Sequence, residues 1–149
     1  MKPYLSILVS LFLFTACLSS DEVSPDAQTE ADILQYIEDN SLTAEKTNSG
    51  LYYIINEPGT GASPSSNSNV TVAYKGYFLN GNVFDQNENG FSIGLNQVIA
   101  GWTEGIQLFK EGGEGVLLVP SNLGYGDNGN RSIPGGAVLV FDIKLISVN

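Results

Sequence analysis

Large aromatic side chains are spaced along the second half of this chain in a way that indicates one binding pocket. The only tryptophan, Trp102, follows a Phe84-Asp85 pair and precedes Tyr125 and Phe141. Together these residues would form an apolar, aromatic-walled cavity with very few polar groups. Such a cavity can bind a small hydrophobic side chain and change the conformation of the backbone that carries it. It offers no group that could hydrolyse, phosphorylate or oxidise a substrate, so the pattern predicts binding or conformational chemistry.

The composition excludes several other kinds of site. No histidine is present, which excludes Ser-His-Asp triads and His-ligated zinc or iron. The single cysteine, Cys17, falls at the end of a leader, so the folded part has neither a thiol nucleophile nor a disulfide. Sixteen acidic residues against six Lys and Arg give a net charge of −10, which argues against nucleic-acid binding. We therefore expect no metal, no nucleotide and no other cofactor.

The first 17 residues have the pattern of an export signal. Lys2 precedes an apolar run over residues 4–14, which is too short to span a bilayer comfortably and has the length of a signal-peptide core. The sequence FTAC at residues 14–17 resembles the bacterial lipobox, in which the cysteine is lipidated and becomes the new N-terminus. The alternative is an ordinary secretory signal cleaved nearby, with Cys17 incidental. Both signals send the chain out of the cytoplasm, and the first predicts a lipid anchor in the cell envelope, on the periplasmic or surface face of the outer membrane.

Residues 18–45 are predicted to form an acidic tether followed by a short helix. The sequence SSDE at residues 19–22 resembles the acidic export tags of some Bacteroidetes surface lipoproteins, although a Ser/Asp/Glu linker has the same composition. Over residues 31–40, Ile33, Leu34 and Ile37 have the spacing of an amphipathic helix. The apolar stripe must cover either the main domain or a neighbouring subunit, and we favour packing or self-association over a ligand site. The oligomeric state does not follow from the sequence.

Residues 46–149 have the pattern of one α+β domain. Runs of β-branched and aromatic residues predict strands over residues 51–56, 70–79, 83–85, 114–120 and 137–148, and Asn80-Gly81 is a hairpin turn signal. In the last run, alternate residues from Ala137 to Leu145 are all apolar, while Asp142 and Lys144 interrupt the opposite face. Apolar residues at three- and four-residue spacing predict a short helix within residues 97–110. We expect an antiparallel sheet of five to six strands wrapped around this helix, preceded by the short N-terminal helix.

Seven segments of this domain, in order, resemble the FKBP-type peptidyl-prolyl cis-trans isomerases. They are VAYKG (72–76), VFD (83–85), VIAGWTEG (98–105), VP (119–120), LGYG (123–126), IP (133–134) and AVLVFD (137–142). The resemblance covers residues 51–149 and implies a pocket with Trp102 as its floor. The walls that it implies are formed by Tyr74, Phe84, Phe91, Val98, Ile99, Tyr125, Ile133 and Phe141.

The resemblance also implies roles for single groups. Tyr74, Asp85 and Tyr125 form the implied catalytic set. The backbone N–H of Ile99 and the hydroxyl of Tyr125 would hydrogen-bond the bound chain. The Asp85 carboxylate would either help to polarise the bound amide or orient a neighbouring tyrosine. The plainer alternative for the aromatic residues is a place in the core, because large apolar side chains of a small domain usually pack there.

Two classes of function follow from this reading. The first is a peptidyl-prolyl isomerase that helps envelope or secreted proteins fold, with proline-containing polypeptides as clients. The second is a membrane-anchored binding module, in which the same pocket holds a proline-containing segment or a small ligand without turnover. Two departures from the family pattern bear on this choice. Asn89 stands where relatives often place another aromatic residue, and Gly135-Gly136 follows Pro134, so we expect a more open pocket wall and a more mobile loop over residues 127–132.

Overall fold

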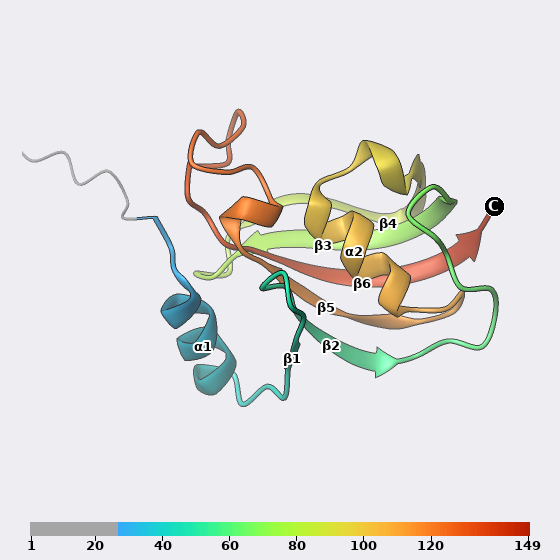
Figure 1. Ribbon diagram of the computed structural model, residues 1–149, viewed down its shortest axis with the longest axis horizontal. Coiled ribbons are helices and arrows are strands. Elements are labelled where there is room, and N and C mark those ends of the chain that lie inside the picture. Colours follow the sequence, from blue (N-terminus) through green and yellow to red (C-terminus); the bar gives the residue numbers. More distant parts are fainter. Residues whose placement is uncertain (1–26) are drawn as a thin grey trace, which may run out of the picture.

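A six-stranded antiparallel sheet organises residues 27–149, the part of the chain that the computed structural model describes (Figure 1). The strand order is β1-β2-β5-β6-β3-β4. The strands are β1 (Glu45–Lys46), β2 (Tyr52–Glu57), β3 (Asn69–Phe78), β4 (Val83–Gly94), β5 (Glu114–Val119) and β6 (Leu139–Val148). The helices are α1 (Glu30–Asp39) and α2 (Ala100–Gly105), with 3₁₀ turns at Leu95–Gln97, Ile106–Leu108 and Ser121–Leu123. The predicted α+β class, with a short N-terminal helix, is confirmed.

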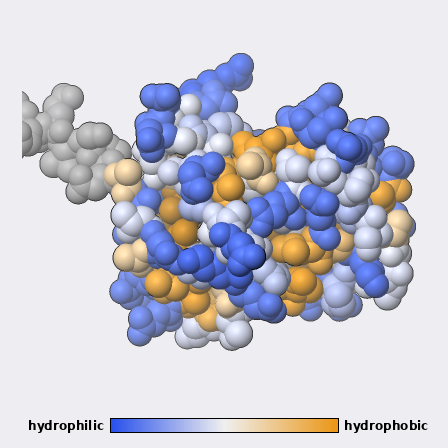
Figure 2. Space-filling view, viewed as in Figure 1, coloured by the Kyte–Doolittle hydropathy of each residue, from blue (hydrophilic) through white to orange (hydrophobic). Residues whose placement is uncertain are grey.

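Several predictions concern residues outside this part of the chain. The predicted signal sequence, its lipobox cysteine Cys17 and most of the predicted acidic tether lie outside the described residues. Within residues 27–149, neither helix has the length and hydrophobicity needed to cross a membrane. On the face shown in Figure 2, hydrophobic residues reach the surface as separate patches among hydrophilic ones. Among the described residues, Leu34 and Ile55 are large hydrophobic residues with 49% and 39% of their surface exposed.

The inner face of the sheet and α2 enclose the main core. Alternate residues of β6 from Leu139 to Leu145 are buried, whereas Asp142 and Lys144 between them are exposed. This pattern confirms the predicted apolar face of the last strand. Ile106, in the turn that follows α2, is fully buried in the same cluster. The helix and the longest apolar strand therefore share one core.

The short helix predicted within residues 97–110 is confirmed and lies over the sheet. The regular helix spans Ala100–Gly105 and then tightens into a 3₁₀ turn. A Cβ on Gly105 would lie 2.6 Å from the Leu117 side chain of β5, so glycine lets the helix lie directly on this strand. Glycine also lowers helix stability by about 1 kcal/mol relative to alanine. Packing on the sheet thus holds this short helix in place.

The outer face of the sheet is covered at one end by α1. Ile33 is 1% exposed, whereas the neighbouring Leu34 points away from the cluster beneath the helix and remains half exposed. The cluster beneath the helix consists of Ile33, Tyr52, Leu118, Val138 and Val140. The apolar stripe of α1 therefore covers the main domain, which was one of the two alternatives that the sequence left open. This contact also explains why Val140 is buried on the interrupted face of β6.

Polar contacts attach α1 to the edge of the sheet. Lys46 Nζ in β1 and Tyr52 Oη in β2 both donate to Glu30 Oε1, each at 2.5 Å. At the start of the helix, the Asp32 carboxylate accepts a hydrogen bond of 2.6 Å from the Thr29 backbone N–H, in the manner of a capping box. The predicted start of the main domain, residue 46, falls within β1. The short helix that precedes it packs against the sheet of that domain.

The β3–β4 hairpin brings pocket residues together. It turns between residues 78 and 83, where Asn80-Gly81 predicts a turn. Gly76 pairs with Asp85 on β4 and with Phe141 on β6. A Cβ on Gly76 would lie 2.7 Å from the Phe84 ring and 2.9 Å from the Phe141 ring. Because residue 76 has no side chain, these two rings can meet over β3.

Strand β4 is longer than the sequence predicts. Only residues 83–85 have an apolar strand pattern, yet the strand continues to Gly94. It lies at the edge of the sheet, where polar residues such as Asn89 remain in water and need no apolar alternation. Val72 pairs with Phe91 and Tyr74 pairs with Asn87, so the register shifts by a bulge in between. The bulge leaves Asn89 without a partner on β3.

Candidate functional site

A cavity of about 420 Å³ is lined by residues of β3, β4, β6 and α2, of the segment that joins β4 to α2, and of the loop that follows β5. Its lining consists of Tyr74, Phe84, Asp85, Phe91, Ile93, Gln97, Val98, Ile99, Trp102, Tyr125 and Phe141. All pocket residues predicted from the sequence are present except Ile133. The sequence analysis did not predict that Ile93 and Gln97 line the pocket. Strand alternation could have indicated Ile93, which lies two residues after Phe91 on β4, but nothing in the sequence distinguishes Gln97.

Trp102 and Phe141 are the most deeply buried lining residues, with 6% and 4% of their surface exposed. The indole of Trp102 lies edge-to-face with two rings. Its centroid is 5.0 Å from that of Tyr74 at an interplanar angle of 80°, and 5.3 Å from that of Phe141 at 79°. Phe84 meets Phe141 at 5.6 Å and 88°. Such perpendicular contacts are a favoured aromatic geometry, so they fix the orientation of the indole.

The polar contact in this aromatic lining joins two strands of the hairpin. The Tyr74 hydroxyl on β3 donates a hydrogen bond of 2.7 Å to Asp85 Oδ2 on β4. Burial and this hydrogen bond raise the pKa of Tyr74 to about 12. The phenol therefore stays protonated at neutral pH and remains a donor. Of the two roles implied for Asp85, the geometry fits the one in which the carboxylate orients a neighbouring tyrosine.

A backbone donor lies at the start of α2. The Ile99 carbonyl accepts hydrogen bonds from the N–H groups of Trp102 at 2.9 Å and Thr103 at 3.1 Å, so it begins the helical turn. The N–H of Ile99 itself precedes that turn and has no partner inside the helix. Since Ile99 also lines the cavity, its N–H can serve a bound chain.

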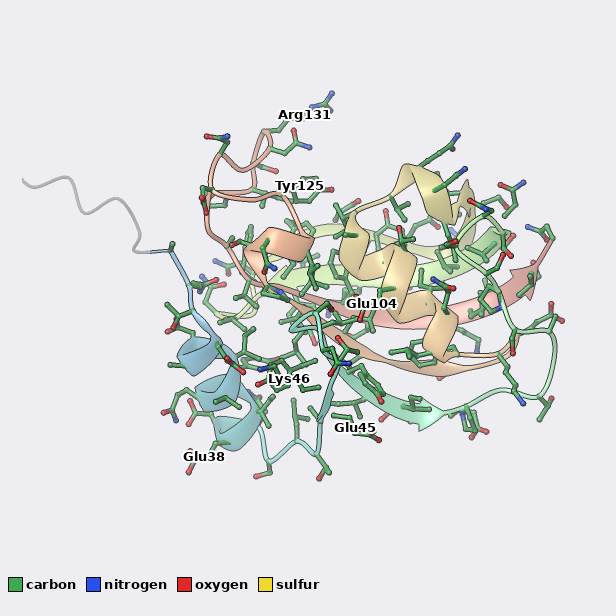
Figure 3. All side chains as sticks on the ribbon, viewed as in Figure 1. Glu38, Glu45, Lys46, Glu104, Tyr125 and Arg131 are labelled. Carbon is green, nitrogen blue, oxygen red and sulfur yellow. The ribbon has the colours of Figure 1, made fainter. Side chains whose placement is uncertain are left out.

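Tyr125 reaches the cavity from the long loop between β5 and β6 (Figure 3). A hydrogen bond of 2.8 Å from the Gly126 N–H to the Ser121 carbonyl closes the turn that carries it. Ile133, predicted as a wall residue, lies in the same loop but packs into the core with 8% of its surface exposed. Its backbone pairs with Asn130 through hydrogen bonds of 2.9 and 2.8 Å. This short bridge folds the loop tip back, and Ile133 supports the loop from below instead of lining the cavity.

The chemistry available in this cavity is that of binding. Asp85 is its one ionisable carboxylate, and it is engaged with Tyr74. Over the described part of the chain, no group of three or more Asp, Glu, His or Cys residues is placed to hold a metal ion. The arrangement can hold a small apolar group against Trp102 and hydrogen-bond the chain on either side of it.

Fold and site together define a small α+β domain with an aromatic binding pocket. The sequence profile of the FKBP-type peptidyl-prolyl cis-trans isomerases matches residues 61–146. The chain belongs to this family.

Relatives support the same assignment. A protein of Neisseria meningitidis, named as a probable FKBP-type peptidyl-prolyl cis-trans isomerase FkpA, is 47% identical over 106 residues, which are 68% of this chain and 39% of the relative. FkpA of Aeromonas hydrophila is 44% identical over 107 residues, covering 70% of this chain and 40% of the relative. The chain thus spans about two fifths of the length of these relatives.

Solved structures share the fold. The crystal structure of FkpA from Escherichia coli matches with a TM-score of 0.74 and 36% identity, over 80% of this chain and 59% of that chain. A peptidyl-prolyl cis-trans isomerase from Pseudomonas syringae pv. tomato matches with a TM-score of 0.71 and 32% identity, over 83% of this chain and 98% of that one. The second comparison covers 98% of the solved chain, so the two proteins share their fold over nearly all of that chain.

Proposed function

We propose that this protein is a peptidyl-prolyl cis-trans isomerase that acts on proline-containing polypeptides. The observation that carries the proposal is the cavity over Trp102, which is walled by aromatic rings and holds one carboxylate. A proline ring is a small apolar group of the kind that such a cavity can hold. Membership of the family supports the same activity.

The proposed reaction needs no bond to be made or broken. Rotation about the X-Pro amide has a barrier of roughly 18 to 20 kcal/mol because the C–N bond has partial double-bond character. At the twisted transition state resonance is lost, and the carbonyl oxygen carries less charge. An apolar cavity therefore disfavours the planar, polar ground state more than the twisted state. Catalysis then follows from holding the proline ring while the preceding residue rotates.

Two groups would hold the client in this mechanism, and a third would position a wall of the pocket. The N–H of Ile99 and the hydroxyl of Tyr125 would bond the backbone on either side of the proline. Asp85 would act through Tyr74, because its hydrogen bond of 2.7 Å supports a role in positioning that ring against Trp102. A correctly oriented ring keeps the cavity complementary to the twisted amide.

A protease-coupled assay on a proline-containing tetrapeptide tests the activity. We expect the cis-to-trans step to be faster with the protein than the uncatalysed step, which takes on the order of 10 to 100 s. No acceleration, combined with measurable binding of the same peptide, would favour the non-catalytic binding module. One observation favours that alternative: Phe91, at the edge of the pocket, is 41% exposed, which leaves that wall open.

We further propose that the protein is anchored in the cell envelope through a lipid on Cys17, where it assists the folding of envelope or secreted clients. The support is the lipobox-like FTAC sequence at residues 14–17. Metabolic labelling with a fatty-acid analogue should mark the wild type and not Cys17→Ser, and the variant should leave the membrane fraction. Unlabelled wild type in its native host would instead indicate a secreted protein without the anchor.

A further inference from the structure

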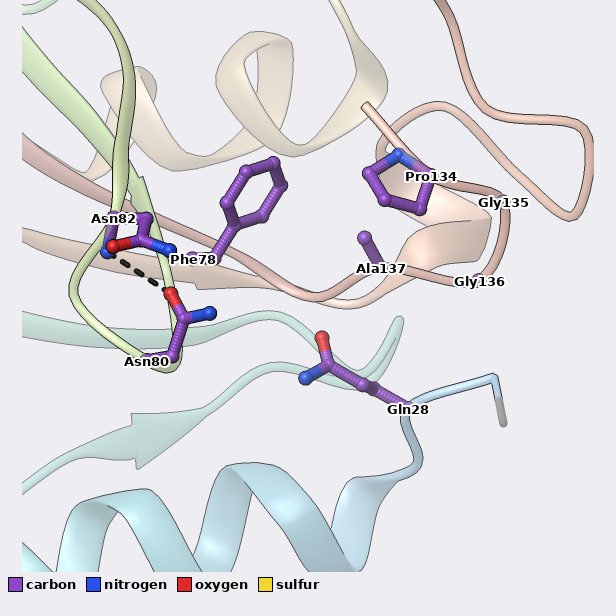
Figure 4. A pocket seen from close by; sticks show the side chains of 8 residues that line it. All are labelled: Gln28, Phe78, Asn80, Asn82, Pro134, Gly135, Gly136 and Ala137. Atoms are coloured by element: carbon purple, nitrogen blue, oxygen red, sulfur yellow. Dashed lines mark hydrogen bonds between the residues drawn. The ribbon is translucent and has the colours of Figure 1, made fainter. Parts of the chain in front are cut away.

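A second cavity, of about 330 Å³, lies beside the turn between β3 and β4. Figure 4 shows Asn80 and Asn82 on one side of it and the segment from Pro134 to Ala137 on the other, with Phe78 and Gln28 between them. The full lining is Gln28, Phe78, Asn80, Asn82, Pro134, Gly135, Gly136 and Ala137, and we call it the amide groove. None of these residues is charged, although the chain carries a net charge of −10. The groove therefore suits a ligand that is polar but uncharged.

The carboxamide side chains of the amide groove keep hydrogen-bonding atoms available. Asn80 Oδ1 accepts a bond of 2.9 Å from the Asn82 backbone N–H, which leaves the Asn80 amide NH₂ as a donor. Gln28 Oε1 accepts a bond of 2.8 Å from the Val138 N–H, which leaves its NH₂ in the same way. The Asn82 side chain has no hydrogen-bond partner within residues 27–149. A carboxamide offers the same donor and acceptor groups as a peptide bond, so these side chains match an extended polypeptide backbone.

The amide groove adjoins the pocket over Trp102. The Phe78 ring lines the groove and lies 5.0 Å, centroid to centroid, from the ring of Phe84. Phe84 in turn lines the pocket and contacts Phe141. An extended chain advances about 3.3 Å per residue, so a chain with its proline in the pocket can reach beyond this pair of rings within a few residues.

We propose that the amide groove is a second binding site for the same client, which takes an extended, uncharged stretch of polypeptide next to the proline. The proposal rests on the proposed function of the pocket. It implies that the preferred substrates are longer than a tetrapeptide. A short peptide occupies the pocket alone, whereas a longer peptide occupies both the pocket and the amide groove. The groove then contributes to client binding and leaves the isomerisation step unchanged.

Two peptides test this with the full chain. One is the proline tetrapeptide, and the other has about ten residues, with the same tetrapeptide at its centre and uncharged polar flanks. The longer peptide should have a KM about tenfold lower at the same kcat, because each added hydrogen bond contributes up to about tenfold. Asn82→Ala should remove about three- to tenfold of that advantage and leave the tetrapeptide unaffected. Asn80→Asp keeps the oxygen that accepts the Asn82 N–H and so keeps the turn, but it removes the NH₂ donor. It should therefore also raise the KM of the longer peptide.

Controls separate this proposal from the proposed function. Asn56→Ala removes an exposed amide on β2 that lines neither cavity, and it should leave both peptides unchanged. Equal KM values for the two peptides would overturn the proposal that the amide groove binds the client. A KM of the longer peptide that does not change in Asn82→Ala and Asn80→Asp would overturn it as well.

If even the tetrapeptide is not turned over, the proposed isomerase activity is wrong. The groove is then tested alone by fluorescence anisotropy of the longer peptide with its proline changed to alanine: weaker binding by Asn82→Ala supports it, and equal binding refutes it.

Discussion

The two faces of the sheet are stabilised in different ways. On the inner face, α2 and the strands bury a continuous core that includes Ile106 and Phe109, and the aromatic pocket is set into this core. On the outer face, α1 buries Ile33 fully and is tied down by an exposed Glu30–Lys46 ion pair. The inner face thus provides rigid support for a site that depends on ring orientation. The outer cover is smaller, and its loss should lower stability without affecting the pocket. Changes on the inner face should affect both stability and binding.

The largest effect is expected from Trp102→Ala on the inner face. Trp102 is 6% exposed, so its loss leaves a cavity in the core and should lower the free energy of unfolding by about 3 to 5 kcal/mol. Peptide binding should be lost as well, because the variant has no floor for the proline ring. Chemical denaturation and peptide titration measure both effects. Trp102→Phe is the matched control and should recover part of each. Unchanged stability would show that the indole is not a core residue.

Removal of the outer cover is expected to separate stability from activity. A chain that begins at Lys46 lacks α1 and exposes Leu118, Val138 and Val140 to water. It should lose about 2 to 5 kcal/mol of stability, and Ile33→Ala in the full chain should lose a comparable amount. Both should isomerise the tetrapeptide at close to the full-length rate, since the pocket lies on the opposite face. A truncated chain that is folded but inactive would mean that α1 contributes to the site.

Smaller changes within the pocket should affect rate more than stability. Tyr125→Phe removes a hydroxyl, and Asp85→Val removes the acceptor of the Tyr74 hydroxyl. Each should lower kcat/KM by up to about tenfold, which corresponds to one hydrogen bond made to or near the twisted amide. Tyr53→Phe is the control, because the Tyr53 hydroxyl bonds Glu45 at the sheet edge, away from the pocket lining. Wild-type rates for both pocket variants would remove the roles assigned to these residues.

The smallest effect concerns the pH dependence of the outer cover. Hydrogen bonds from Lys46 and then Tyr52 lower the pKa of Glu30 below its ordinary value of 4.5. A carboxyl group with a lowered pKa in the folded state stabilises that state above 4.5, and the contribution is lost as the pH falls through the lowered pKa. The melting temperature of the wild type should therefore exceed that of Glu30→Gln slightly at neutral pH, and the two should converge in acid. Glu38→Gln on the same helix controls for the loss of a charge. A difference that persists in acid would contradict this account.

Much of the fold was predictable because short-range patterns encode it. Alternation from Leu139 to Leu145 assigned one face of β6 to the core, and Asn80-Gly81 located the hairpin turn. The sequence was less informative where a strand is polar and exposed to solvent. The polar residues of β4 beyond Asp85 lie at the sheet edge and remain solvated, so the strand continues there without an apolar signal.

The sequence by itself determined which residues are aromatic, which faces are apolar and which chemistries are impossible without histidine or a cysteine in the domain. Only the tertiary structure decided that α1 packs on the sheet, that Ile133 faces the core, and that the Asp85 carboxylate bonds Tyr74. It also placed Gln28 beside Val138, which is 110 residues further along the chain. The physical reason is that periodicity shows which side chains share a face. What covers that face, and which polar atoms meet, depends on contacts between segments far apart in the chain.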